Sequence, residues 1–326
     1  MTTINTASRL VTYGAAAATP LVTPETDVSQ FSTATLKSLS LTDITRLSTS
    51  QVIQIDAANM GYLSGSQLAA FSTQQIQALT EPQVTALSST QLQSLTARQV
   101  TALSVEQLNA ISTSKISALK ATQISAISTT VLSGLDNSEL KNLTASQIQA
   151  LTTDQIVGLI ADQLAALGTA QIANLKNNQV AAIALDDITA LTTNQVKALS
   201  GTQVKSLTVA QLGALQTDQI QAIDTADMAG LTATQLGAWS STQLSALSTA
   251  QVNALSGSVF KALSAAQLQA FTTTQVSKFS DAQIKGLTAT QFDALSTSQL
   301  TALTTSQVAL LSVANLATLD TADVAA

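Results

Sequence analysis

Apolar and polar positions recur along this chain with a period of eight residues. From Phe31 to Ala326 the sequence divides into 37 consecutive octads (296 residues), without insertion or deletion. The first and sixth positions of every octad are apolar, as in the octad Leu247–Ala254 (LSTAQVNA), which gives 74 apolar positions without a polar exception. Because a fixed period over this length is typical of stacked repeats, we expect one repeat domain over residues 31–326. Residues 1–30 lack the period and should form an N-terminal arm or a cap.

Each octad carries the signals that begin a helix. The second position is Ser, Thr or Asp in 31 octads, and the fifth is Gln in 26. Ser/Thr-x-x-Gln is a capping box, and the apolar residues before the cap and at the fourth helical position form a hydrophobic staple. Pro82, the only proline in the octads, falls in the first turn of its helix, where a missing N–H costs nothing. Where Gln is absent the substitute is often another acceptor, which we expect to cap in the same way: Asp43, Asn59, Glu139, Asp187, Asp227, Asn315 and Asp323.

These signals predict an all-α solenoid of short capped helices. One helix of this length is unstable alone, so the apolar positions must pack on neighbouring octads. The eighth position is Ala in 22 octads and Gly or Ser in seven more, which indicates that two backbones approach each other there. The period leaves the number of octads per superhelical turn open between two and four.

Two other folds fit the period less well. A β-solenoid could use positions one and six as opposite faces, but the richness in Leu, Ala and Gln and the scarcity of turn signals disfavour strands. In one continuous α-helix the apolar row would rotate by about 80° per octad and wrap every face. The β-solenoid therefore stays as the alternative fold.

Composition excludes several classes of function. The chain has no cysteine and no histidine, which excludes disulfides, thiol chemistry and the usual zinc sites. Its net charge of −6, with only 13 Lys and Arg, offers no basic face for nucleic acid. No stretch approaches the roughly 18 apolar residues of a membrane span. Residues 1–13 lack the basic start and apolar run of a Sec signal peptide, so we expect no cleaved N-terminal signal.

The acidic pairs are candidate sites with simple structural interpretations. Asp186 and Asp187 are adjacent, but neighbouring side chains on a helix point apart, and Asp187 occupies the capping position. Asp154 and Asp162 share position four of successive octads, without the alternating oxygen ligands of a calcium loop. We expect no metal-ligating or catalytic residue among them.

The aromatic residues and the single sequon also have structural interpretations. Trp239, Phe271 and Phe279 occupy the apolar first position and should be core residues. Tyr62 and Arg46 stand at the normally small eighth position, so the first octads are less regular than the middle. Asn142-Leu-Thr144 matches a glycosylation sequon, a weak signal when it occurs once. With no phosphate-binding loop, no nucleophile elbow and no histidine base, we expect no enzyme, no cofactor and no catalytic site.

In composition the chain resembles bacterial extracellular filament and surface-layer repeat proteins, which are commonly acidic, cysteine-free and rich in Ser, Thr and Ala. Some proteins of this kind lack an N-terminal signal and leave through a one-step exporter that reads an uncleaved C-terminus. The segment Leu319–Ala326 is similar to such signals in its acidic and small apolar residues. The resemblance implies an extracellular or cell-surface location, with the cytoplasm as the alternative.

The sequence therefore predicts a non-enzymatic structural protein that assembles with copies of itself into an extracellular filament or surface lattice. The alternative is a binding solenoid that presents a Ser-, Thr- and Gln-rich recognition surface. The last octad, 319–326, keeps apolar residues at positions one and six, so we expect an open apolar end. Residues 1–30, with Leu10, Val11, Tyr13 and Leu21, should dock on the C-terminal octads of the next copy, head to tail.

Overall fold

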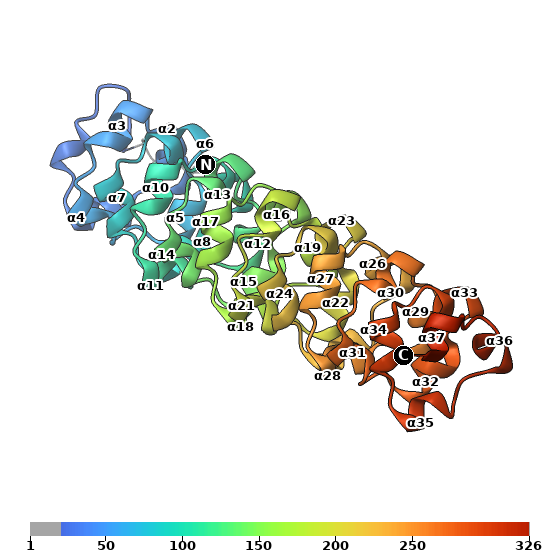
Figure 1. Ribbon diagram of the computed structural model, residues 1–326. Coiled ribbons are helices and arrows are strands. Elements are labelled where there is room, and N and C mark those ends of the chain that lie inside the picture. Colours follow the sequence, from blue (N-terminus) through green and yellow to red (C-terminus); the bar gives the residue numbers. More distant parts are fainter. Residues whose placement is uncertain (1–20, 326) are drawn as a thin grey trace, which may run out of the picture. The chain divides into compact units, whose positions relative to one another are not determined.

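A computed structural model describes residues 21–325 of the chain. All regular structure in this range is helical: one 3-10 helix, η1 (Val28–Gln30), and 37 α-helices of four to six residues each. The helices divide into two compact units, residues 1–102 and 103–326, and each unit is described by itself. Figure 1 labels most of the helices, which follow one another in sequence order within each unit, with short bends between them.

Unit 1 holds the first nine α-helices. Each begins at the third position of an octad and ends before the next octad's cap. After η1 they are α1 (Thr33–Ser38), α2 (Leu41–Arg46), α3 (Thr49–Gln54), α4 (Ala57–Met60), α5 (Gly65–Ala69), α6 (Thr73–Ala78), α7 (Glu81–Ala86), α8 (Ser89–Ser94) and α9 (Ala97–Thr101).

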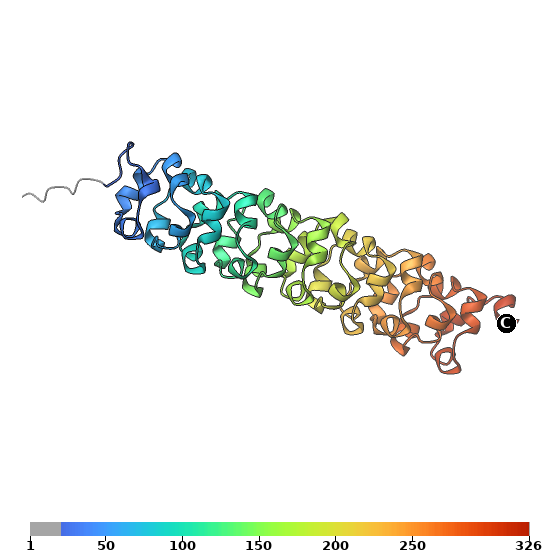
Figure 2. The same cartoon turned by 90° about the vertical axis from the view of Figure 1, so that its left-hand side faces the viewer.

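Unit 2 continues the same pattern without a change of phase, and the turned view in Figure 2 shows the same succession of short helices. Its helices are α10 (Val105–Asn109), α11 (Thr113–Ile116), α12 (Ala121–Ile124), α13 (Thr129–Ser133), α14 (Asn137–Lys141), α15 (Ala145–Ala150), α16 (Thr153–Val157), α17 (Ala161–Ala166), α18 (Thr169–Ala173), α19 (Asn177–Ala182), α20 (Leu185–Ile188), α21 (Thr193–Lys197), α22 (Gly201–Ser206), α23 (Val209–Ala214), α24 (Thr217–Ala222), α25 (Thr225–Met228), α26 (Ala233–Gly237), α27 (Ser241–Ala246), α28 (Thr249–Ala254), α29 (Gly257–Lys261), α30 (Ala265–Gln269), α31 (Thr273–Val276), α32 (Asp281–Gly286), α33 (Ala289–Asp293), α34 (Thr297–Thr301), α35 (Thr305–Val308), α36 (Val313–Leu316) and α37 (Thr321–Ala325).

The predicted capping box begins most of these helices. In α28, the hydroxyl of the N-cap Ser248 accepts from the N–H of Gln251 at 3.2 Å, while Gln251 Oε1 accepts from the N–H of Ser248 at 3.0 Å. Pro82 stands in the first turn of α7, behind the N-cap Thr80. The all-α solenoid of short capped helices is confirmed, and the described residues contain no strand.

The apolar positions form the core. From Leu36 to Leu295, every residue at positions one and six is buried, with exposed fractions of 0–5%. Trp239, Phe271 and Phe279 are among them, as predicted. Phe271 and Phe279 pack with Phe260 in one aromatic cluster whose ring centroids lie 4.7–5.6 Å apart. Burial of these apolar positions within each unit is what holds helices that are individually too short to be stable.

Within each unit, a helix packs against the third helix along the chain, as in the pairs α5·α8 and α29·α32. Side-chain hydrogen bonds in the same units join residues 28 residues apart, for example Gln75 to Leu47 and Gln203 to Leu175. One superhelical turn therefore takes between three and four octads, close to 28 residues, inside the range of two to four that the sequence left open.

Close packing at position eight is also confirmed. Gly134 and Gly286 occupy this position, and each packs against the octad that lies three octads earlier in the sequence. A Cβ added at Gly134 would lie 2.7 Å from Val105, and one at Gly286 would lie 3.1 Å from the carbonyl oxygen of Gly257. Small residues recur at position eight because the third and seventh positions of another octad press against it.

The prediction that acceptors other than Gln cap in the same way is correct only in part. Asp43 and Asn315 complete capping boxes, and Asp323 exchanges the same two bonds with Asp320. Asn59, Glu139, Asp187 and Asp227 do not, and the prediction is wrong for these four. At α14 and α25 the N-cap is itself an Asp, so Glu139 and Asp227 each meet a second carboxylate at the helix start, which disfavours the reciprocal bond. At α4 the N-cap Asp56 accepts from the N–H of Ala58 in place of that of Asn59. At α20 the N-cap is Ala184, which has no hydroxyl to offer.

Residues 21–30 pack on the first octads of their own chain. Val22 and Val28 are buried, and Gln51 Nε2 donates to the carbonyls of Thr23 and Thr26 at 2.9 and 3.0 Å. Asp43 Oδ1 accepts from the N–H of Leu21 at 2.9 Å. This part of the N-terminal segment thus covers the first turn of the stack. Leu10, Val11 and Tyr13, which were expected to dock on another copy, lie outside the described residues.

Candidate functional site

The buried glutamines at position five are the most regular polar feature of the molecule. Most of them use both ends of the amide. Gln203 Oε1 accepts from the N–H of Ser200 at 2.8 Å, which completes the box at the start of α22. Its Nε2 donates to the carbonyls of Ile172 and Leu175 at 3.0 and 2.8 Å, at the C-terminal end of α18. One side chain therefore satisfies the start of one helix and the end of the helix four earlier.

We call this series of contacts the glutamine ladder. At 23 glutamines, Nε2 donates to the carbonyl 28 residues earlier, at 2.7–3.0 Å. The donor always belongs to the later octad and the acceptor to the earlier one. Each unit consequently has a direction: it presents amide donors toward its N-terminal side and carbonyl acceptors toward its C-terminal side.

The sequence signal had indicated only the first half of this arrangement. The capping box is local and can be read from a spacing of three residues. The second bond depends on a separation of 28 residues, which no repeat in the sequence marks.

The ladder has gaps where acids replace Gln. Asp187 and Asp227 stand 28 residues after Leu159 and Leu199, whose carbonyl oxygens receive no hydrogen-bond donor from the described residues. Burial raises the pKa of Asp187, and the charge of Asp186 raises it further. Burial likewise raises the pKa of Asp227, with a second contribution from Asp224. An ionised carboxylate is unfavourable in a position built for an amide donor.

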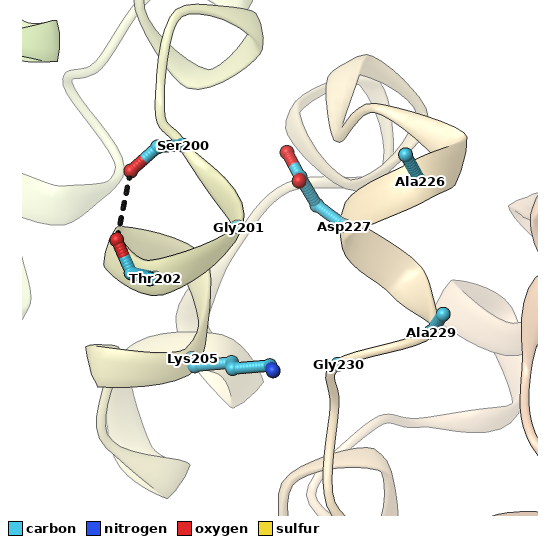
Figure 3. Close-up of a pocket in the computed structure, with 8 residues that line it drawn as sticks. All are labelled: Ser200, Gly201, Thr202, Lys205, Ala226, Asp227, Ala229 and Gly230. Carbon is cyan, nitrogen blue, oxygen red and sulfur yellow. Dashed lines mark hydrogen bonds between the residues drawn. The ribbon is translucent and has the colours of Figure 1, made fainter.

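Asp227 also lines a shallow groove of about 410 Å³ between α22 and α25, drawn in Figure 3. Two glycines leave room for the charged side chains in this groove, those of Asp227 and Lys205. A Cβ at Gly201 would lie 2.6 Å from Asp227 Oδ1, and one at Gly230 would lie 2.0 Å from Lys205 Cε. Ser200 and Thr202 share a hydrogen bond of 3.2 Å between their hydroxyls. The groove thus offers one carboxylate, one ammonium and hydroxyl groups already bonded to each other.

The other candidate residues do not come together into a site. Asp154 and Asp162 are both exposed, and no hydrogen bond or ion pair joins them in the described structure. Tyr62 is half exposed, and the ammonium of Lys37 lies 5.0 Å from its ring centroid, an ordinary cation–π distance. Asn142, the sequon residue, is exposed and donates through Nδ2 to the carbonyl of Ser138 at 2.8 Å. In the part of the chain that the structure describes, no group of three or more acidic residues could hold a metal ion.

The C-terminal octads differ from those between Leu36 and Leu295 in exposing their apolar positions. Val308 and Leu316 occupy position six, and their exposed fractions are 46% and 45%. Leu300, Leu303, Leu311 and Leu319 are partly exposed. Together these six side chains, which we call the C-terminal face, line most of a groove of about 270 Å³. The sequence analysis expected an open apolar end at the last octad, 319–326, and in this octad Leu319 is partly exposed and Val324 is exposed.

Comparison with known proteins identifies a repeat. The family model of the ALTTAQ repeat matches two segments of unit 2, residues 180–217 and 220–257. Its six letters correspond to position eight followed by positions one to five, as in Ala246–Gln251 (ALSTAQ). The chain is thus a repeat protein, similar to this family over those segments. A comparison with curated proteins finds no match. No helix among residues 21–325 is long and apolar enough to cross a membrane.

Proposed function

We propose that this is a non-enzymatic structural protein whose copies join head to tail in an extracellular filament or surface lattice. The observation that carries the proposal is the C-terminal face. Its positions one and six are the same positions that are buried throughout from Leu36 to Leu295. A surface of this kind on a soluble protein is typical of a protein–protein contact.

The direction of the glutamine ladder supports contact between unlike ends. Two C-terminal faces would bring carbonyl acceptors against carbonyl acceptors and leave them unpaired. A contact between a C-terminal face and a different surface can pair them with donors. Such a heterologous contact repeats without limit unless it closes a ring.

Composition supports a location outside the cell. The chain is acidic, lacks cysteine and has few charged residues. These properties are shared with the extracellular filament and surface-layer proteins that it resembles. The cytoplasm remains the alternative, and protease treatment of intact source cells separates the two, because only an external protein is digested.

A binding solenoid is the second candidate function, and the structure limits which side chains could form its recognition surface. The position-five glutamines are buried in the ladder, apart from the partly exposed Gln267, and cannot form a recognition surface. Many position-two hydroxyls are used in caps. What remains is the exposed Ser and Thr of positions three and four, together with grooves such as the one at Lys205 and Asp227.

Electron microscopy of the purified chain over a range of concentrations tests the proposal. We expect filaments or lattices whose length grows with concentration. Particles that remain single at the highest concentrations, at neutral pH and moderate salt, would contradict it. Single particles that bind a soluble glycan or protein would instead favour the binding solenoid.

A further inference from the structure

Exposed large apolar side chains are rare in the middle of the chain. Among residues 64–299, all of which the structure describes, only four are exposed: Val157, Ile160, Leu185 and Val209, with exposed fractions of 42–54%. We call these four side chains the apolar row. All of them fall between residues 157 and 209, within unit 2. Exposed apolar side chains that gather in one region are typical of an interaction surface.

Three members of the apolar row lie at the starts of helices that pack in succession. Ile160 is the N-cap of α17, and Leu185 and Val209 are the first residues of α20 and α23. Helix α17 packs on α20, and α20 packs on α23. Residues 25 apart meet across such pairs, as Asn253 Nδ2 and the carbonyl of Lys278 do at 3.1 Å. Ile160 and Leu185 have this same separation, so they are neighbours on the surface.

The apolar row replaces residues that would stabilise its helices. Position two is Ser, Thr or Asp in 31 octads, and Ile160 is the only large apolar residue that stands there. No side chain caps α17, and none caps α20, whose N-cap is Ala184. A missing N-cap hydroxyl destabilises a helix. Half of the Ile160 side chain lies in water, so burial within the chain does not compensate for the lost cap.

The surroundings of the apolar row are acidic. Asp162 and Asp186 are exposed on the first turns of α17 and α20, in the same helices as Ile160 and Leu185. Between residues 142 and 196 the charged residues are four acids and one base: Asp154, Asp162, Asp186, Asp187 and Lys176. An occupant that carries positive charge as well as apolar groups complements this surface.

A second copy of the chain does not have this chemistry. The other exposed large apolar side chains of the described residues lie in two stretches, 21–62 and 300–324. The first stretch carries four acids against two bases, and the second carries two acids and no base. Contact between any of these surfaces and the apolar row would bring carboxylates together.

We infer that the apolar row binds a cationic amphipathic segment of a partner protein. Apolar side chains of the segment cover Ile160, Leu185 and Val209, and its Lys or Arg residues pair with Asp162 and Asp186. An amphipathic helix that lays its apolar face on an exposed apolar surface is a recurring mode of peptide recognition. Because the apolar row does not include the C-terminal face, this inference does not depend on the proposed head-to-tail assembly.

A fluorescent synthetic peptide of about 18 residues, built from Leu and Lys with the leucines on one helical face, tests the inference on the full chain. Its fluorescence anisotropy should rise and saturate. We expect the affinity to fall more than about tenfold when Ile160→Ser and Leu185→Ser are combined. Leu41→Ser is the matched control, because Leu41 is also the first residue of its helix, α2, and is 51% exposed. It should bind normally.

The apolar variant also controls for folding. Ile160→Ser supplies the hydroxyl that the N-cap of α17 lacks, so this variant should melt no lower than wild type. Lost binding in a chain of undiminished stability would come from the surface itself. A peptide of the same composition, with Leu and Lys reordered so that no apolar face forms, should bind at least about tenfold more weakly than the amphipathic one.

The acidic part of the surface is tested by a pair of charge variants. Asp162→Asn combined with Asp186→Asn should weaken binding several-fold at low salt and reduce its dependence on salt. Asp281→Asn combined with Asp293→Asn removes the same number of charges from exposed acids of α32 and α33 and should leave the affinity unchanged. Equal losses in the two pairs would show that the peptide responds only to net charge, which would overturn the inference.

Two further outcomes would overturn it. One is equal affinity of the peptide for wild type and for the chain with Ile160→Ser and Leu185→Ser. The other is self-association of wild type that this variant abolishes and that excess peptide does not inhibit, because a second copy would then cover the apolar row. Electron microscopy of the same variant separates the inference from the proposed function: filaments should form as in wild type, whether or not the peptide binds.

Discussion

The interior octads of unit 2 and its last octads share one pattern but have opposite surfaces. Val204 and Val308 are the same residue at the same octad position, followed by Ser/Thr caps of the same kind. Val204 is completely buried, whereas nearly half of Val308 is exposed. The difference does not lie in the octad itself. It lies in whether another octad covers it, so burial in this protein is a property of the stack.

The largest expected effect comes from placing a charge at these two positions. Val204→Asp buries a carboxylate without a partner in a close-packed core, which should cost more than about 4 kcal/mol of unfolding free energy. Val308→Asp should cost less than about 1 kcal/mol, because the carboxylate stays in water. Urea unfolding followed by circular dichroism measures both. Similar losses for the two variants would show that the C-terminal face is not a free surface.

The next effect compares two glutamines, one inside the ladder and one outside it. Gln203→Ala removes bonds at both ends of a buried amide and should cost about 2–4 kcal/mol. Gln269, at position seven, is exposed, and its side chain donates to the carbonyl of Ala294 at 2.8 Å. Gln269→Ala should therefore cost less than about 1 kcal/mol. The same urea titration distinguishes the two variants. If Gln203→Ala lowers the free energy of unfolding no more than Gln269→Ala does, the ladder bonds of Gln203 do not stabilise the fold.

The local half of this arrangement could be predicted from the sequence, and the long-range half could not. Ser/Thr-x-x-Gln and the apolar positions specify a capped helix within eight residues, and the structure has those helices where the octads place them. The turn of about 28 residues is three and a half octads, which is not a whole number of repeats. Since successive turns meet out of phase, no longer period is imposed on the sequence. Gln203 could therefore be read as a cap but not as a contact to Leu175.

The groove at Lys205 and Asp227 likewise depends on long-range contacts that the sequence does not predict. Gly201 and Gly230 are unremarkable glycines in the sequence, and only the stack brings them against Asp227 and Lys205. The acids at ladder positions were read as alternative caps, because a spacing of three residues cannot show that a carboxylate also faces carbonyls from an earlier turn.

A smaller effect is expected at the gaps in the ladder. Asp227→Gln restores an amide that can donate to the carbonyl of Leu199, so it should stabilise the chain by about 1 kcal/mol at neutral pH. Asp154→Gln changes an exposed acid outside the ladder and serves as the control, with no gain expected. Thermal unfolding of both variants provides the comparison. A loss of stability in Asp227→Gln would mean that the carboxylate has a favourable role in the groove.

The smallest expected effect is the pH dependence of stability that Asp187 and Asp227 cause at these gaps. The folded-state pKa values of Asp187 and Asp227 are raised above the ordinary value of about 3.9, so protonation favours the folded state. Their contribution is present below that value and is lost as pH rises through the folded pKa. A variant with Asp187→Asn and Asp227→Asn should therefore melt higher than wild type at pH 7, and the difference should vanish below about pH 3.9. A difference that grows on acidification would have the wrong sign.

Asp43 in unit 1 provides the opposite case. The hydroxyl of Ser40 lowers its pKa, assisted by the N–H groups of Ser40, Val22 and Leu21. Its contribution is present above the ordinary value and is lost as pH falls through the lowered folded pKa. Asp43→Asn should thus destabilise the chain at pH 7 and make little difference at the lowest pH that still permits folding, as thermal unfolding would show.

The most direct test of the account is hydrogen exchange of the C-terminal octads as a function of protein concentration. If assembly covers the C-terminal face, amides between Leu300 and Val324 should exchange rapidly in dilute protein and become protected as concentration rises. Amides of interior octads, such as those around Val204, should be protected throughout. The account predicts this change in wild type and its absence in Leu316→Asp. Rapid exchange of residues 300–324 at every concentration, in samples that nevertheless form filaments, would show that assembly does not use this face.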